Sequence, residues 1–219
     1  MTAIVPVPAE VVGRHDALLT PVGDRSPLQL IVDTLRTAGP VTLAVVPALS
    51  AAVAETLGTG RDPDLRMIVT EPDADRGACL AAGLPANTGG VVLVHDIAWP
   101  VFDPVMCRRV TAALAAGAHV VVPTRAVTDS VKTVDDTGAV TGTVDRSRLR
   151  TAQYPRGFDA AKLAMLLDAR ETPFDELTAA IDAGIPVVEV EGDERAVRTD
   201  LPRDTGYLRA VIAARSADR

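Results

Sequence analysis

The stretch VVLVHDIAWPVFDPVMCRRVTAALAAGAHVVVPT (residues 91–124) carries the pattern that decides the fold. Its apolar beginning predicts a buried strand over residues 91–96, and a second apolar run predicts another over 119–124. Between them, Asp103 followed by Pro104 predicts the start of a helix that continues to Ala116. Buried strands that alternate with helices are typical of a parallel sheet covered on both faces.

The same alternation fills the chain before this stretch. Apolar runs predict strands over residues 3–7, 41–47 and 65–71. A helix is expected to begin after Ser26, with Pro27 in its first turn, and to end before Gly39. Two further helices are expected over residues 51–57 and 73–84. These elements predict a doubly wound α/β fold with a mostly parallel sheet.

The alternation of apolar strands and helices stops at residue 129. The sequence VKTV, the turn DDTG and then AVTGTVD predict a polar β-hairpin within residues 129–146. An exposed two-stranded ribbon is marginal alone in water, so we interpret it as an arm that packs on a second copy of the chain. Helices are expected again over residues 160–170, 174–183 and 202–214, with a strand over 187–193. The chain is thus read as a single domain, residues 1–219, with an inserted β-arm.

Composition excludes several classes of protein. The 219 residues are 47% hydrophobic and 23% charged, as in a globular domain, and two cysteines are too few for a disulfide framework. A net charge of −7 argues against nucleic-acid and anionic-membrane surfaces, which attract basic proteins. The sequence shows no secretory signal and no apolar run near ~20 residues, so a cytoplasmic protein is expected.

Asp96 is the first candidate for chemistry, because it follows a buried strand. Ligands of open α/β sheets bind beyond the carboxyl ends of the strands, and a carboxylate there can hold a Mg²⁺ ion that bridges nucleotide phosphates. The alternative is structural. Asp96 would then cap the next turn, and His95 would hydrogen-bond to the backbone.

At this point the chain resembles a known family. HDIAWP (residues 95–100) is similar to the HDAARP motif of 2-C-methyl-D-erythritol 4-phosphate cytidylyltransferase, an enzyme of the non-mevalonate isoprenoid pathway. Further motifs match in order over almost the whole chain: residues 82–84 resemble the end of S-V-x-x-G-L, 129–132 resemble DTxK, 143–146 match T-x-D-R, 153–158 resemble QTPQxF, 174–176 fall on TDE, and 196–199 fall on N-I-K-x-T. The resemblance implies a Rossmann-like nucleotidyltransferase fold, a homodimer joined through the arms, and CTP, a sugar phosphate and Mg²⁺ as ligands.

The resemblance also implies roles for individual residues. Asp96 would bind Mg²⁺ and take part in catalysis together with Arg14 and Arg198, and Arg14 or Arg198 would neutralise the triphosphate. Ser130 and Arg146 would hold the sugar phosphate across the dimer. Nucleotide binding would also involve the residues Pro6, Val7 and Gly83. Four arginines have a plainer interpretation: Arg146 as a surface ion pair with Asp145 or Asp135, and Arg198, Arg195 and Arg156 as solvated charge.

The segment after the first strand departs most from the family. Where the family has A-A-G-x-G-x-R followed by P-K, this chain has VPAEVVGR (residues 7–14) and then Asp16-Ala17. Pro8 lacks a backbone donor and Glu10 brings negative charge, so the loop is a poor cradle for phosphates. Both lysines of the chain lie elsewhere, at positions 132 and 162.

Other family positions have changed as well. Trp99 replaces a basic residue, and it is read either as a dimer-interface anchor or as a plug in the nucleotide cleft. Cys79 stands at the serine of the S-V motif, and Arg198 at the lysine of N-I-K. Two functions remain open: a cytidylyltransferase whose activity is weak or lost, or a non-catalytic paralogue that binds a phosphorylated ligand or a protein partner.

Overall fold

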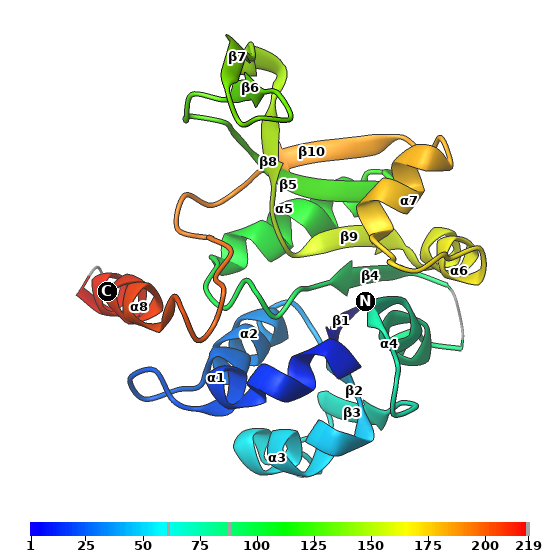
Figure 1. The fold of residues 1–219 in the computed structure, drawn as a ribbon. Helices are drawn as coiled ribbons and strands as arrows, with labels where there is room; N and C mark the ends of the chain where they lie inside the picture. Colours follow the sequence, from blue (N-terminus) through cyan, green and yellow to red (C-terminus); the bar gives the residue numbers. More distant parts are fainter. Residues whose placement is uncertain (61, 87–88, 218–219) are drawn as a thin grey trace.

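The computed structural model describes residues 1–60, 62–86 and 89–217. In these residues one sheet has the strand order β10-β5-β9-β4-β1-β2-β3, and β8 pairs with β5. Its strands are β1 (Thr2–Val7), β2 (Val41–Val45), β3 (Leu65–Val69), β4 (Val91–Val94), β5 (Val120–Ala126), β8 (Arg150–Ala152), β9 (Arg156–Asp159) and β10 (Val187–Glu191). Figure 1 shows helices on both sides of this sheet.

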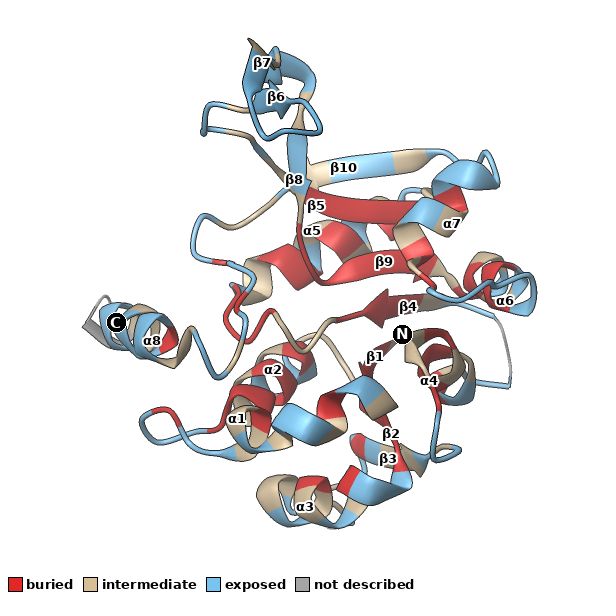
Figure 2. Ribbon diagram, in the orientation of Figure 1, coloured by how far each residue is buried: buried red, intermediate tan, exposed pale blue. Residues whose placement is uncertain are grey.

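The central strands are buried because they contain almost only apolar residues. All five residues of β2 are buried, and β1 is buried from Ala3 onward. β1 pairs in parallel with both β2 and β4, as the apolar runs predict. Figure 2 shows the buried residues concentrated in these strands and in the helix faces that cover them.

The helices α2 and α5 begin at the caps that the sequence predicts, whereas α3 begins at Pro47, before the predicted start at residue 51. At the start of α2, the Ser26 side chain accepts from the Gln29 amide and the Gln29 side chain accepts from the Ser26 amide, which completes a capping box. Asp103 caps α5 by accepting the Val105 amide. The helices are α1 (His15–Leu19), α2 (Pro27–Arg36), α3 (Pro47–Leu57), α4 (Arg76–Gly83), α5 (Pro104–Ala115), α6 (Ala160–Asp168), α7 (Glu176–Asp182) and α8 (Thr205–Ala217).

The predicted fold class is confirmed, and the structure adds segments that the pattern does not show, among them the short strand β8. The chain after β1 forms a 3-10 helix, η1 (Ala9–Arg14), followed directly by α1. The short strand β9 lies between β4 and β5 and is antiparallel to both, so the sheet is mostly parallel rather than wholly so.

The predicted hairpin forms a separate two-stranded sheet of β6 (Lys132–Val134) and β7 (Val140–Thr143). Its turn is closed by the Asp135 carboxylate, which accepts hydrogen bonds from the amides of Thr137 and Ala139. The hairpin projects from the body of the molecule where β5 ends and before β8 begins. It is exposed along most of its length (Figures 1 and 2).

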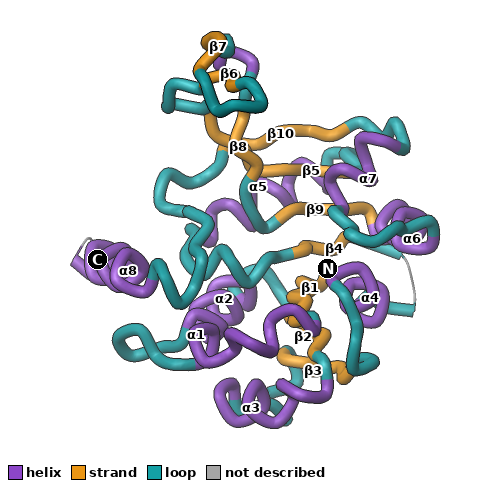
Figure 3. The backbone as a smooth tube through the Cα atoms, viewed as in Figure 1, coloured by secondary structure: helices purple, strands orange, loops and turns teal. Residues whose placement is uncertain are grey.

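One edge of the sheet collects the segments that carry the sequence motifs. β1 and β4 run in parallel and therefore end at the same edge, where η1 and Asp96 follow them. The first residue of β9, Arg156, pairs with Val94, the last residue of β4, so the antiparallel β9 begins at this edge as well. Figure 3 shows the loops that leave the strands here. Within the described residues, the structure contains no helix with the length and apolarity needed to cross a bilayer.

Candidate active site

A cleft of about 330 Å³ opens at this edge of the sheet. Pro6 of β1 and the η1 residues Glu10 and Arg14 line one side of it and belong to residues 6–14, here called the opening segment. Arg198 lines it from the loop before α8. On the remaining sides the lining includes Arg76, Asp96, Trp99, Tyr154, Arg156 and Asp175. Of the predicted site residues, the structure thus brings together Asp96, Arg14, Arg198 and Pro6.

Asp96 has the structural role that the sequence offered, and its side chain also reaches the cleft. Its Oδ1 accepts the amide of Ala98 at 2.8 Å, so it caps the turn after β4. Its side chain is still 26% exposed and lines the cleft. His95 is fully buried, and its Nε2 lies 2.9 Å from the Trp99 carbonyl oxygen, to which it can donate.

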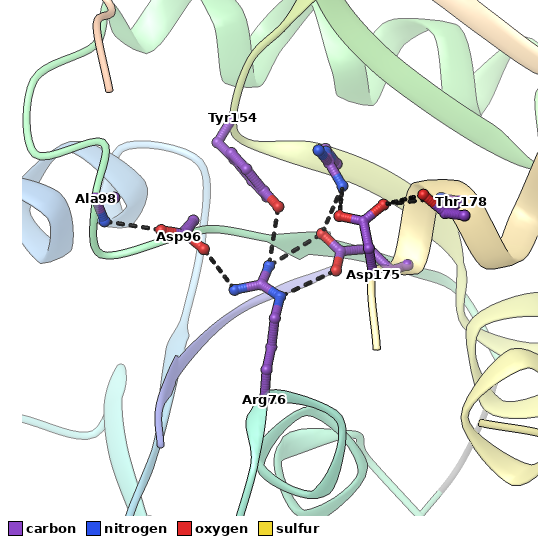
Figure 4. A network of polar contacts seen from close by, with 8 residues as sticks. Arg76, Asp96, Ala98, Tyr154, Asp175 and Thr178 are labelled. Carbon is purple, nitrogen blue, oxygen red and sulfur yellow. Dashed lines mark hydrogen bonds and ion pairs between the residues drawn. The ribbon is translucent and has the colours of Figure 1, made fainter. Parts of the chain in front are cut away.

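The second oxygen of Asp96 is held by Arg76, the first residue of α4. Arg76 Nη1 donates to Asp96 Oδ2 at 2.7 Å, and Nη2 donates to the Tyr154 hydroxyl at 3.1 Å. The same guanidinium forms a fork with Glu176, through Nε to Oε2 at 3.1 Å and Nη2 to Oε1 at 3.0 Å (Figure 4). Burial alone would lower the pKa of Arg76, but Glu176, Tyr154 and Asp96 together raise it. Arg76 is therefore a permanent cation in the wall of the cleft.

A second arginine completes the network. Arg156 Nη1 donates to Asp175 Oδ2 at 2.8 Å and to Glu176 Oε1 at 3.2 Å. Its guanidinium carbon lies 4.3 Å from the centre of the Tyr154 ring. The Glu176 carboxylate has no exposed surface, and two guanidinium groups compensate the cost of burying its charge. Arg156 is thus a buried structural cation rather than a solvated surface charge.

Trp99 and Tyr154 narrow the cleft. Both residues are only 6% exposed, and their ring centres lie 6.1 Å apart. Burial, followed by the Glu176 charge, raises the pKa of Tyr154, so its hydroxyl stays protonated at neutral pH. The buried position of Trp99 agrees with its interpretation as a residue that fills part of the cleft. The structure of a single chain gives no support to its other interpretation, as an interface anchor.

The other predicted site residues do not line the cleft. Val7 is fully buried at the end of β1. Gly83 packs against β1, where an added Cβ would lie 2.6 Å from Ile4 Cγ2, so close helix packing explains this glycine.

Ser130 and Arg146 flank the hairpin, outside the residues that line the cleft in this single chain. Within the described residues, no ion pair joins Arg146 to Asp145 or Asp135, whose carboxylates accept hydrogen bonds from Ser147 and Thr137. The predicted role of both residues requires a second copy of the chain.

The opening segment has few amides free to bind phosphate. The Ala9 amide donates to the Ala74 carbonyl at 3.0 Å, and the Val11 amide donates to the Pro8 carbonyl at 3.1 Å. Pro8 has no amide hydrogen, and the Glu10 side chain belongs to the cleft lining. On the cationic side, Arg14 lies 3.6 Å from Asp200 in an exposed ion pair.

Asp96 determines whether the cleft fits a Mg²⁺ ion. Among the residues that the structure describes, no group of three or more acidic, histidine or cysteine side chains could form a metal cage. Mg²⁺ needs no such cage where one or two carboxylates combine with phosphate oxygens and water. A single carboxylate such as Asp96 is compatible with this kind of site, in which a nucleotide supplies the phosphate oxygens.

Sequence reasoning missed Arg76 and did not assign a role to Tyr154. Arg76 carries a signal in retrospect, because a cation in the first turn of a helix faces the positive end of the helix dipole. Such a position needs compensating anions, and the structure supplies Asp96 and Glu176. Tyr154 stands where the resembled QTPQxF motif has threonine, so it was visible only as a departure.

Comparison with known proteins agrees with the fold and the motifs. The model of the 2-C-methyl-D-erythritol 4-phosphate cytidylyltransferase family matches residues 28–213. A relative of that name from Nocardia farcinica is 35% identical over 198 residues, covering 90% of this chain and 86% of the relative. The chain belongs to this family. A cytidylyltransferase of the same name from Rhodococcus jostii is 33% identical over 87% of this chain and 84% of its own length.

Solved structures of the family have the same fold. The cytidylyltransferase from Thermus thermophilus is 25% identical with a TM-score of 0.75, and the two chains are covered to 97% and 98%. The synthase from Anaerococcus prevotii has a TM-score of 0.80 at 20% identity. The match to the cytidylyltransferase family model begins at residue 28, so it leaves out β1 and also η1, which belongs to the segment that departs most from the family motif.

Proposed function

We propose that this chain binds CTP and 2-C-methyl-D-erythritol 4-phosphate in the cleft and joins them, with a turnover far below that of a family member with an intact glycine-rich loop. The observation that carries the proposal is the position of Asp96, at the carboxyl end of β4 and on the wall of a cleft that Arg14 and Arg198 also line.

In this reaction a phosphate oxygen of the acceptor attacks the α-phosphorus of CTP. The bond from that phosphorus to the oxygen of the β-phosphate breaks, and pyrophosphate leaves with the electron pair. Arg14 and Arg198 neutralise charge on the triphosphate, and Asp96 would hold a Mg²⁺ ion, which would supply further positive charge for the leaving group. Ser130 and Arg146 reach the acceptor phosphate from the arm of a second copy, in a cytoplasmic homodimer.

The backbone amides of the opening segment are the reason to expect a reduced turnover. Backbone amides that point at a phosphate stabilise the charge that develops in the transition state, and losing one such donor commonly costs ~10²–10³ in rate. Here Ala9 and Val11 have given their amides to backbone carbonyls, and Pro8 has none to give. The same observation favours the second candidate function, a non-catalytic paralogue that binds a phosphorylated ligand or a protein partner.

Pyrophosphate release from CTP, Mg²⁺ and the sugar phosphate tests the proposal. We expect a rate at least ~10²-fold below that of the Nocardia farcinica relative under the same conditions. Asp96→Ala should abolish this rate, whereas Glu171→Ala, a change of equal charge at an exposed residue outside the cleft, should leave it unchanged.

Turnover that survives in Asp96→Ala would contradict the role of this carboxylate. A complete lack of turnover, together with no heat of CTP binding in calorimetry, would instead favour the non-catalytic paralogue.

A further inference from the structure

The contact between Arg76 and Asp96 places a fixed positive charge where a metal ion would otherwise meet the carboxylate. Arg76 Nη1 is 2.7 Å from Asp96 Oδ2, and the Ala98 amide holds Oδ1 at 2.8 Å. Both oxygens thus have a donor, and the carboxylate is fixed in one orientation. A guanidinium and a divalent cation that share one carboxylate oxygen repel each other.

Arg76 cannot easily move away to make room. Its Nε and Nη2 groups are already used, because they donate to Glu176 and to the Tyr154 hydroxyl. Glu176 is fully buried, so releasing Arg76 would leave a buried carboxylate with only Arg156 as its partner. Breaking one side of a buried ion pair is strongly unfavourable.

We propose that Arg76 is a positioning residue that acts as the built-in counter-cation of Asp96, so that Asp96 does not bind a free divalent ion in the absence of nucleotide. A metal ion reaches the carboxylate only when phosphate oxygens bring enough negative charge to offset the guanidinium. This inference rests on the proposed function, which assigns Asp96 to the metal, and extends it to the order in which metal and nucleotide arrive.

Manganese, which reports its own binding by electron paramagnetic resonance, is the probe, in buffer without nucleotide. The wild-type protein should show no bound Mn²⁺ at concentrations where the double variant Arg76→Gln/Glu176→Gln does. Because Arg76 contacts Asp96 directly and Glu176 does not, losing the guanidinium outweighs losing the Glu176 carboxylate, and we expect the variant to bind Mn²⁺ at least ~10-fold more tightly. Adding Asp96→Asn to the double variant should abolish that binding.

The double variant removes both charges of the Arg76–Glu176 pair, so the only carboxylate that loses its arginine partner is Asp96, which is partly exposed to the cleft. Circular dichroism and thermal melting check that it folds, and the single variant Arg76→Gln gives the same comparison if it does not. Arg109→Gln is the matched control, because it removes an arginine that pairs with Glu191 outside the cleft. This control should bind as little free Mn²⁺ as the wild type.

Equal Mn²⁺ affinity in the wild type and the Arg76 variants would overturn the inference, whether both bind or neither does. A lack of pyrophosphate release from CTP would count against the proposed function alone, since the Mn²⁺ titration uses no nucleotide. The two failures are therefore distinguishable.

Discussion

His95 shows at the scale of one residue how burial makes the site sensitive to acid. Its ring lies 4.4 Å from that of Phe102 and 6.0 Å from that of Tyr154, and its Nδ1 has no hydrogen-bond partner among the described residues. Burial lowers the pKa of His95 to about 4, against the opposing effect of the Trp99 carbonyl.

Between about pH 4 and pH 6.5, unfolding of the chain is therefore accompanied by the uptake of a proton at His95. In the unfolded chain His95 titrates near 6.5, so below that pH the unfolded state binds more protons than the folded state. Stability should fall as the pH drops from 6.5 towards 4. The contribution of His95 to this loss is about 2 kcal/mol at pH 5.

Urea unfolding at pH 7.5 and pH 5.0 measures this loss. In His95→Asn, the difference in the free energy of unfolding between the two pH values should be about 2 kcal/mol smaller than in the wild type. His119→Asn, at a histidine whose side chain is exposed, should keep the wild-type difference. The same pH dependence in the wild type and His95→Asn would show that this ring is not the acid-sensitive group.

The residue scale also shows why only part of the site could be predicted. Asp96 was predictable because it closely follows a strand of four apolar residues. Arg76 and Glu176 meet at 3.0 Å although 100 positions separate them in the chain. No local pattern encodes that pairing, which depends on where the fold places the first residues of α4 and α7.

At the scale of elements, strands made of a continuous apolar run were predictable, whereas a short strand without such a run was not. β2 and β4 are continuous apolar runs. β9 has the sequence RGFD, which lacks a strand pattern, and Gly157 within it is needed because a Cβ there would lie 2.3 Å from Val110 Cγ1 of α5. Pairing with β4 and β5, and not a local strand pattern, makes this segment part of the sheet.

The element η1 offers a test of the opening segment. Glu10 places a carboxylate on the cleft wall, where it opposes the binding of a triphosphate. We expect Glu10→Gln to tighten CTP binding about fivefold, equivalent to roughly 1 kcal/mol, and the gain should shrink as salt is added. Titration calorimetry at low ionic strength measures it.

Glu55→Gln is the matched control, because it removes the same charge from the exposed surface of α3. An equal gain in both variants would mean that the total charge of the chain, and not the position of Glu10, governs CTP binding.

At the scale of the whole molecule, the hairpin stands apart from the main sheet. β6 and β7 form their own sheet, and their apolar side chains face solvent in the single chain: Val134 is 60% exposed and Val140 is 67% exposed. A two-stranded ribbon is marginal alone, and exposed apolar residues on it are typical of a surface that meets another chain. We therefore predict a dimer held by this arm.

Deleting residues 131–144 should convert the protein from a dimer of about twice 22.9 kDa into a monomer in size-exclusion chromatography with light scattering. The deletion keeps Ser130 and Arg146 in the chain, yet pyrophosphate release should fall with the dimer if both act across it. The double variant Val134→Lys/Val140→Lys retains the hairpin and removes only its apolar contact, so it should also give monomers. A dimer that survives both changes would place the interface elsewhere, and Ser130 and Arg146 would then lose their route to the cleft.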